Sequence, residues 1–236
     1  MPRRPSVTRR WMTAATWPVG LTLTSWDYMW RITPLHRREI VEHGLSGHLP
    51  PPVPEGVDRA EILGPDRGRG PLFHRRYRTQ IADARLGPDE LMATLKANLN
   101  RAAPTKFARF QRVLGDEGPL VAGDEFVVRM PGPWDGPVRV VAADERSFRL
   151  ATLEGHLEAG QIEFRVLPGD PIAFEIESWA RSADRFADLL YDRARLAKEV
   201  QLHMWISFLE GVVSISGGRM TGGVDIDTRR VESGAP

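Results

Sequence analysis

Residues 161–177 read Gln161-Ile-Glu-Phe-Arg-Val-Leu-Pro-Gly-Asp-Pro-Ile-Ala-Phe-Glu-Ile-Glu177, which is two alternating apolar and polar runs separated by a Pro-Gly-Asp turn. Strict alternation of this kind indicates a β-strand with one buried face. A short turn between two such runs joins them as antiparallel neighbours. The stretch therefore predicts an antiparallel hairpin with one face on a core and the other in solvent.

More strands are expected on the N-terminal side of this hairpin. Strand-like runs bounded by turn residues predict a meander over 124–130, 137–143, 147–154, 161–167 and 171–180. A further strand is expected at 71–81. Two short helices follow it. One starts near Pro88, which suits a first helical turn, and the other spans 105–114, where apolar side chains share one helical face.

A long helix is expected from about Ser182 to Glu210. Its apolar residues recur at helical spacing, and they include Phe186, Leu189, Leu190, Ala197, Val200 and Met204. From Leu202 to Leu209 most sides of this helix are apolar, so we expect that part to be the most deeply buried. The sequence thus predicts an α+β fold in which a curved antiparallel sheet of about six to seven strands wraps around one long C-terminal helix.

Composition divides the chain into five segments. They are a disordered basic tail at 1–16, an aromatic-rich arm at 17–45, a Pro/Gly linker at 46–70, the main domain at 71–216 and a Gly-rich tail at 217–236. The arm holds Trp17, Trp26 and Trp30, which need a surface to cover them, either on the main domain or on a second copy of the chain. For the C-terminal tail the sequence leaves open an edge strand or a loose end.

The overall composition excludes several kinds of site. None of the 236 residues is cysteine, so disulfides, thiolate nucleophiles and zinc–thiolate centres cannot form. The net charge of +1 argues against nucleic-acid binding driven by bulk charge. No run approaches the roughly 18 apolar residues of a membrane span. We expect a cytoplasmic protein with no cofactor and no metal site.

Three motifs carry a resemblance to a known family. Gly70-Pro-Leu-Phe-His-Arg-Arg-Tyr77, Met130-Pro-Gly-Pro-Trp-Asp-Gly-Pro-Val138 and Gly155-His-Leu-Glu-Ala-Gly-Gln-Ile-Glu-Phe164 resemble domain-of-unknown-function family nineteen-ninety, of the START-like helix-grip type, over about 71–210. The arm segment Leu23–Arg38 resembles actinobacterial members. The resemblance implies a START-like fold with an apolar cavity, and it implies no catalytic residues.

Arg75 and Tyr77 are candidate ligand-binding residues on the first strand. Alternation places Phe73, Arg75, Tyr77, Thr79 and Ile81 on one face. This face is the more apolar one, so Arg75 is expected to point inward. A buried guanidinium must be paired. Arg75 therefore anchors an anionic ligand head group, pairs with an internal carboxylate or lies near the open rim.

His156 is a candidate at the mouth of the cavity. Gly155 and Gly160 frame its turn, and glycine permits a positive φ or a close backbone approach. If Phe148 and Leu150 face inward, His156 continues that face. The histidine then serves as a base or head-group donor. The structural alternative is a histidine that only stabilises its own turn.

Two tryptophans complete the candidate ligand-binding residues. Trp134 lies in a turn stiffened by prolines, next to the hairpin signal Asp135-Gly136. It either closes a cavity entrance or plugs the core of the domain. Trp205 lies on the long helix, where it packs in the core or lines the cavity.

These patterns support three functions. The first is binding of a hydrophobic small molecule or lipid in an internal cavity, oriented by groups such as Arg75 and His156. The second is an enzyme of cyclase, hydratase or hydrolase type that uses acid–base residues in the cavity. The third is a protein-interaction module that uses the aromatic arm, with the cavity filled by side chains. The arm also allows a homodimer. One scaffold can host all three.

Overall fold

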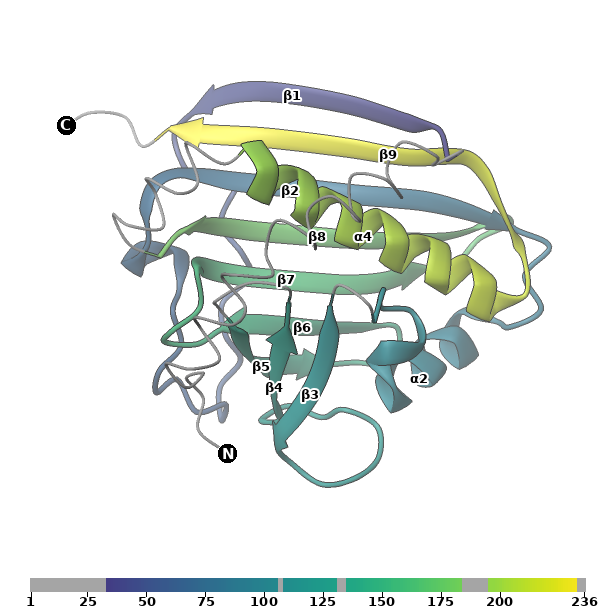
Figure 1. The fold of residues 1–236 in the computed structure, drawn as a ribbon, viewed down its shortest axis with the longest axis horizontal. Helices are drawn as coiled ribbons and strands as arrows, with labels where there is room; N and C mark the ends of the chain where they lie inside the picture. The colour runs from purple at the N-terminus through teal and green to yellow at the C-terminus, as the bar shows by residue number, and fades with distance from the viewer. Residues whose placement is uncertain (1–32, 106–107, 131–134, 184–194, 233–236) are drawn as a thin grey trace, which may run out of the picture.

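The fold of the chain is α+β, in a computed structural model that describes residues 33–105, 108–130, 135–183 and 195–232 (Figure 1). In chain order the strands are β1 (Leu35–His43), β2 (Arg69–Ala82), β3 (Arg109–Leu114), β4 (Glu125–Arg129), β5 (Asp135–Ala143), β6 (Ser147–Thr152), β7 (Glu158–Leu167), β8 (Ile172–Ser182) and β9 (Arg219–Glu232). The helices are α2 (Pro88–Ala97) and α4 (Arg195–Ser216), with short 3₁₀ turns η1 (Pro65–Arg67) and η2 (Leu99–Arg101).

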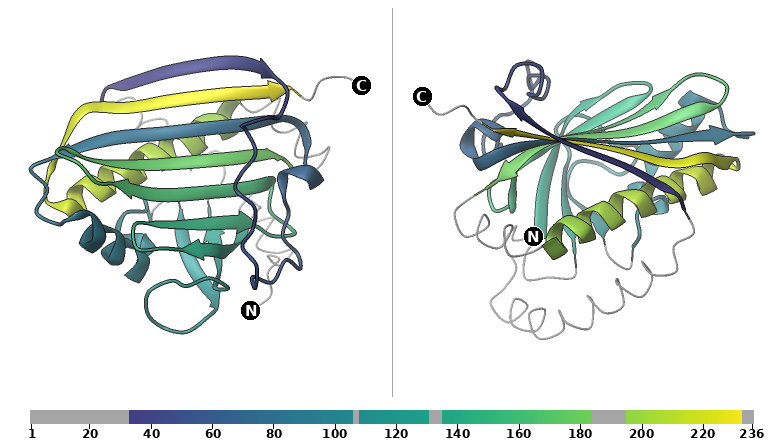
Figure 2. Two further views of the ribbon diagram at one scale, coloured as in Figure 1. Left: turned by 180° about the vertical axis from the view of Figure 1, so that it is seen from behind. Right: turned by 90° about the horizontal axis from the view of Figure 1, so that it is seen from above.

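One curved sheet holds all nine of these strands, in the order β1-β9-β2-β8-β7-β6-β5-β4-β3. The strands from β4 to β8 form the antiparallel meander that the turn chemistry predicts, and β3 pairs antiparallel with β4 at its end. β1 runs parallel to β9, so the sheet is mixed. Both α2 and α4 lie on the same face of the sheet, here called the inner face (Figure 2). The predicted helix-grip arrangement is confirmed.

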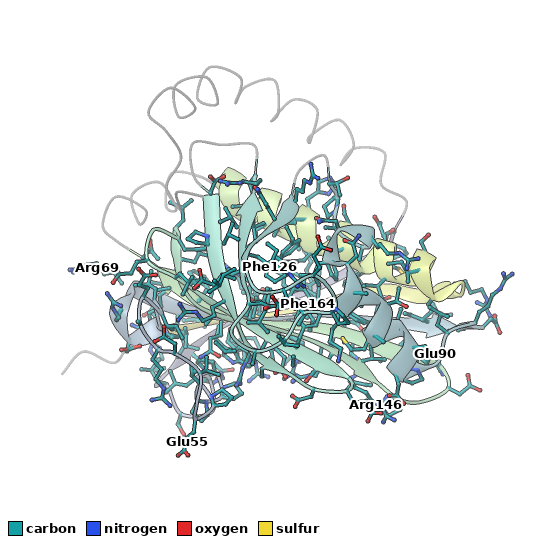
Figure 3. All side chains as sticks on the ribbon, turned by 90° about the horizontal axis from the view of Figure 1, so that it is seen from below. Glu55, Arg69, Glu90, Phe126, Arg146 and Phe164 are labelled. Carbon is teal, nitrogen blue, oxygen red and sulfur yellow. The ribbon has the colours of Figure 1, made fainter. Side chains whose placement is uncertain are left out.

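Packing on the inner face follows from the alternation in the strands. The ring of Phe164 on β7 stacks on Phe148 of β6, with 4.6 Å between centroids, and contacts Phe208 of α4 at 5.2 Å. Figure 3 shows Phe126 and Phe164 between the sheet and α4. Between Leu202 and Leu209, six side chains of α4 are at most 8% exposed: Leu202, His203, Trp205, Ile206, Phe208 and Leu209. The expected burial of this part of the helix is confirmed.

Two expectations about the ends of the sheet need correction. Residues 105–114 do not form a second helix, because 109–114 form β3 and Phe110 pairs with Val128 of β4. The sequence pattern alone does not decide between helix and strand over these residues, and pairing with β4 does. The sheet also has more strands than the predicted six to seven. β9 adds an internal strand between β1 and β2 where the sequence left open an edge strand or a loose tail.

The outer face of the sheet is not solvated as expected. Glu175 and Glu177 on β8 are each only 4% exposed, because residues 44–62, here called the strap, cross this face (Figure 2). Backbone carbonyls of the strap accept hydrogen bonds from outer-face side chains: Gln161 to Pro51, Arg149 to Pro52, and Arg139 to Asp58 and Ala60. The strap thus forms a second layer, and the outer-face charges pair beneath it.

The two glycines that frame the His156 turn have different physical roles. Gly155 has φ +96° and open space around its Cα. At Gly160, an added Cβ would overlap the carbonyl oxygen of Trp179 and lie 2.8 Å from Cα of Ala180 on β8. Gly155 is therefore needed for its dihedral angle, and Gly160 for the close approach of two backbones.

We predict that Gly160→Ala destabilises the protein far more than Gly155→Ala. The first change forces β7 from β8, so we expect a loss of at least about 3 kcal/mol or failure to fold. The second costs about 1–2 kcal/mol of backbone strain. Urea unfolding of the two variants measures both. Equal losses would contradict the close-packing role of Gly160.

Glu177 is the centre of the outer-face charge network. It accepts hydrogen bonds from His74 and Arg76 and pairs with Arg165. Burial alone would raise the pKa of Glu177, but the two hydrogen bonds and the positive charge of Arg165 outweigh it and lower the pKa to about 2. A carboxyl with a lowered pKa stabilises the fold above its ordinary pKa of 4.5 and loses that contribution as the pH falls toward 2.

We predict that Glu177→Gln destabilises the fold by about 3 kcal/mol at pH 7, with a deficit that shrinks as the pH falls from 4.5 toward 2. Urea unfolding across this pH range tests it. Glu163→Gln on the same face is the matched control, because burial raises the pKa of Glu163 and removal of its charge should produce no such deficit. A deficit that stays constant with pH would contradict this account.

Candidate functional site

Arg75 lies on the inner face, as its place in the alternation of β2 predicts. It is 6% exposed and pairs in register with Ser178 of β8. Its guanidinium carbon lies 4.6 Å from the ring centroid of Phe73, and its Nη1 donates to Oε1 of Gln201 at 3.3 Å. Tyr77, two residues further along β2, is 2% exposed within the core. The structure thus places the cation between β2 and α4.

A hydrogen-bonded chain continues from Arg75 to His156. Nε2 of Gln201 donates to Oε2 of Glu158 at 2.9 Å, and the backbone N–H of Glu158 donates to Nδ1 of His156 at 2.9 Å. We call Arg75, Gln201, Glu158 and His156 the inner polar chain. It joins β2, α4 and the start of β7, so it links two predicted site residues that are 81 positions apart in the sequence.

The ring of His156 is held in one orientation and one tautomer. An added Cβ on Gly136 of β5 would lie 3.0 Å from Nε2 of His156, so the ring occupies the space that this glycine leaves free. Burial lowers the pKa of His156, although the charge of Glu158 acts against it. A backbone N–H can only donate, so Nδ1 is the acceptor and the proton of the neutral ring is on Nε2. His156 is therefore a neutral hydrogen-bond donor.

We predict that His156 titrates below the ordinary imidazole pKa of 6.5 and carries its proton on Nε2. Stability linked to this group is complete above pH 6.5 and is lost as the pH falls through its lowered pKa. Long-range ¹H–¹⁵N NMR spectra of the histidine rings report both properties, and His156→Gln assigns the signal. An Nδ1–H tautomer, or a titration above pH 7, would contradict the geometry.

Trp205 lies one helical turn after Gln201 and is 7% exposed. Its ring contacts Phe164 edge-on, with 5.6 Å between centroids. Its Nε1–H is buried and has no acceptor among the residues that the structure describes. Trp205 therefore combines an apolar contact with an unused donor. Trp134, the remaining predicted site residue, lies outside the described residues, as does the 17–32 part of the aromatic arm.

The described part of the site presents donors next to an apolar interior. His156 offers Nε2–H, Trp205 offers Nε1–H, and Oε2 of Glu158 already accepts from Gln201. Such an arrangement suits a ligand with an acceptor oxygen on an apolar body. Gln201 is the residue that the sequence did not single out. The available signal was its position four residues before Trp205, which places both side chains on the same face of the helix.

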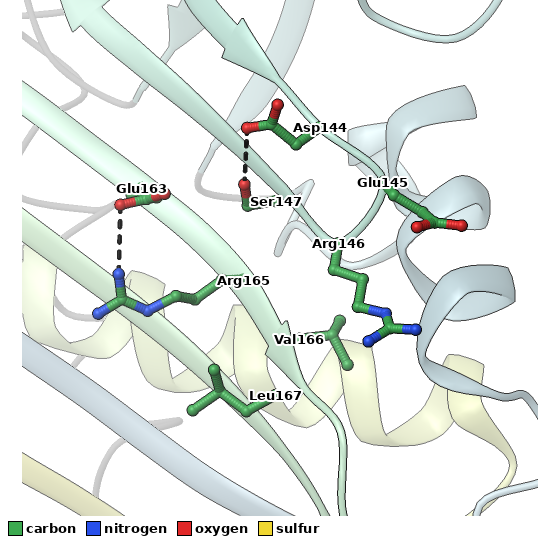
Figure 4. Close-up of a pocket in the computed structure, with 8 residues that line it drawn as sticks. All are labelled: Asp144, Glu145, Arg146, Ser147, Glu163, Arg165, Val166 and Leu167. Atoms are coloured by element: carbon green, nitrogen blue, oxygen red, sulfur yellow. Dashed lines mark hydrogen bonds and ion pairs between the residues drawn. The ribbon is translucent and has the colours of Figure 1, made fainter.

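A separate hollow of about 400 Å³ lies at the β6–β7 hairpin (Figure 4). It is open to solvent and lined mainly by charged residues: Asp144, Glu145, Arg146, Ser147, Glu163, Arg165, Val166 and Leu167. Two of its charges already pair, since Nη1 of Arg165 lies 3.3 Å from Oε2 of Glu163. The inner polar chain does not contribute to this lining, so we keep the candidate site on the inner face.

The described residues contain neither a metal-binding group nor a membrane-spanning helix. No group of three or more histidine or acidic side chains there is arranged to hold a metal ion. No helix in the described ranges is both long and apolar enough to cross a membrane.

Comparison with known proteins gives one family and several distant structures. Residues 63–208, more than half of the chain, match the model of DUF1990, a domain of unknown function. The match includes the inner polar chain and excludes β1 and β9. No curated protein matches the chain in sequence.

Solved structures with a similar fold include two plant proteins. Norcoclaurine synthase from Thalictrum flavum is 14% identical with a TM-score of 0.43, over 63% of this chain and 92% of the synthase. Major latex-like protein 151 from Panax ginseng is 12% identical with a TM-score of 0.48, over 62% of this chain and 99% of the ginseng protein. Both are distant similarities of fold, from which we infer no function.

Proposed function

The chain belongs to the DUF1990 family, and we propose that it binds a hydrophobic small molecule or lipid between the inner face of the sheet and α4. The observation that carries the proposal is the buried Nε1–H of Trp205, which has no acceptor among the described residues. A buried donor without a partner costs about 1–3 kcal/mol. A ligand oxygen at this position would offset that cost.

The surroundings of Trp205 support an apolar ligand with one polar end. Aromatic and aliphatic side chains of β4, β5 and β7 line the inner face, among them Phe126, Val138 and Phe164. In this proposal Arg75 and the Nε2–H of His156 are further donors for the polar end. Tyr77 contributes to the apolar wall, and Trp134 closes the entrance.

We also propose that the protein acts in the cytoplasm, consistent with its lack of cysteine.

The geometry favours binding over catalysis by the same groups. An enzyme of cyclase, hydratase or hydrolase type needs a base that can accept a proton from its substrate. Nδ1 of His156 is occupied by the backbone N–H of Glu158, and Nε2 carries the proton of the neutral ring. His156 is thus placed to donate a hydrogen bond and not to abstract a proton.

Two fluorescent probes test the proposal on the full chain. The probes share an aryl-naphthylamine body. 1-Anilinonaphthalene-8-sulfonate carries an anionic acceptor, and N-phenyl-1-naphthylamine does not. We predict that both bind, and that Trp205→Phe weakens only the sulfonate, by about 3- to 10-fold, because it removes one hydrogen bond and keeps an aromatic ring.

Trp179→Phe is the matched control. Trp179 is also buried, but it lies on the outer face, in a cluster with Leu72 and Val231. This variant should bind both probes like the wild type. Failure of the wild type to bind either probe would contradict an internal site. An equal loss of both probes in Trp205→Phe would contradict the hydrogen-bond role of Nε1–H.

A further inference from the structure

Two histidines fasten the first part of the strap to the sheet. His48 of the strap is 8% exposed, and its Nδ1 lies 3.2 Å from Nδ1 of His74 on the outer face of β2. The two rings meet edge to face, with 5.5 Å between centroids. A direct contact between two Nδ1 atoms is a hydrogen bond only if one of them carries a proton and the other does not.

The other nitrogen of each ring, Nε2, lies within hydrogen-bonding distance of a carboxylate. Nε2 of His48 is 2.7 Å from Oε2 of Glu42 on β1, and Nε2 of His74 is 2.7 Å from Oε1 of Glu177 on β8. The four groups therefore form a line, Glu42–His48–His74–Glu177, that crosses from the end of β1 through the strap to the middle of the sheet. We call this line the clasp.

Other charged groups around the clasp are already paired. Arg229 of β9 bonds Glu42 at 3.0 Å, and Arg76 of β2 bonds Glu177 at 2.8 Å. Arg165 of β7 bonds Glu177 as well, and Trp179 of β8 stacks on the ring of His74 at 5.4 Å. Each carboxylate thus contacts an arginine as well as a histidine. Imidazole is the side-chain type whose charge ordinarily changes between about pH 5 and 8.

The number of protons on the ring nitrogens of His48 and His74 decides whether all three hydrogen bonds of the clasp can form. Its three hydrogen bonds need three protons on four ring nitrogens, which is one neutral and one cationic imidazole. With two protons, one of the three bonds is lost. With four protons, two N–H groups and two positive charges face each other across 3.2 Å, so the rings must separate. Only the three-proton state therefore keeps all three hydrogen bonds of the clasp.

We propose that the clasp is a proton-operated switch that holds the strap on the sheet near neutral pH and releases its first part in mild acid. Acid adds the fourth proton, which sets two positive charges against each other across 3.2 Å. The far end of the strap stays in place, because Leu63 N–H bonds Thr152 and Ile62 bridges Leu153 without any titrating group. The carbonyls of Pro51 and Pro52 are likewise held, by Gln161 and Arg149. Release is therefore local to residues 44–50, and it exposes the outer face next to β2.

Hydrogen exchange of the full chain tests the switch. After correction for intrinsic exchange rates, protection of the peptide that holds His48 should fall about tenfold between pH 7.5 and pH 5.5. Loss of a hydrogen bond to a charged group, about 1.5 kcal/mol, corresponds to a factor of about ten. The amide of His48 is a direct reporter, because it bonds Leu45 O at 3.1 Å. The peptide over β7 should keep its protection at both pH values.

Three variants separate the clasp from general acid sensitivity. His48→Gln and His74→Gln should each remove the pH dependence of the strap, because neither retains two imidazoles in contact. His43→Gln, at an exposed histidine on β1, should behave as the wild type does. Far-UV circular dichroism checks that each variant is folded, and the two clasp variants serve as independent tests if one is not.

Three results would overturn the proposal. The first is equal protection of the strap at the two pH values. The second is loss of the pH dependence in His43→Gln. The third is a pH profile that changes after treatment with EDTA, because that result would assign the paired Nδ1 atoms to a metal ion in place of a shared proton.

Discussion

The ring of Phe164 occupies the centre of the fold, where it meets Phe148 of the neighbouring strand and both Trp205 and Phe208 of α4. This aromatic contact holds α4 against the meander. Aromatic pairs add about 0.5–1.5 kcal/mol each beyond the area that they bury. Because α4 is held here, Gln201 and Trp205 stand opposite β2 and β7. The candidate site is thus a consequence of how the helix is fixed.

The second constraint is that the sheet is covered on both faces. The helices cover the inner face, and an extended strap covers part of the outer one. A strap contributes few apolar side chains. The buried polar groups on this face are therefore satisfied by ion pairs and by hydrogen bonds to backbone carbonyls of the strap. Glu125 with Arg139, and Glu177 with His74 and Arg76, illustrate this arrangement. Such a layer is more sensitive to pH than an apolar core.

Local pattern predicted much of this structure. The alternation in β2 placed Arg75 and Tyr77 inward correctly, and the apolar stretch of α4 was correctly expected to be the most buried. The glycines around His156 were correctly read as positions of special backbone geometry. The helix at 105–114 was wrong, because pairing of Arg109–Leu114 with β4 overrides the helical spacing of the apolar residues.

Contacts between segments that are far apart in the chain could not be predicted from the sequence. Glu175 and Glu177 alternate like solvated residues, but side chains of the neighbouring strands and the path of the strap bury them. The contact of His48 with His74 depends on where an irregular segment crosses the sheet, and no periodicity encodes that position. The link from Arg75 to Glu158 through Gln201 likewise depends on the angle of α4. Arg75 was predicted to need a partner, but the identity of that partner was a question of tertiary structure.

The indole N–H signal of Trp205 tests the central claim most directly. A ¹H–¹⁵N spectrum of the full chain resolves indole signals, and Trp205→Phe identifies this one among the seven tryptophans. On titration with dodecanoate, the account predicts a downfield shift of the Trp205 indole proton that saturates with binding. The signals of Trp179 and the outer face should stay in place. Binding that shifts outer-face signals and leaves Trp205 unchanged would contradict an internal site between the sheet and α4.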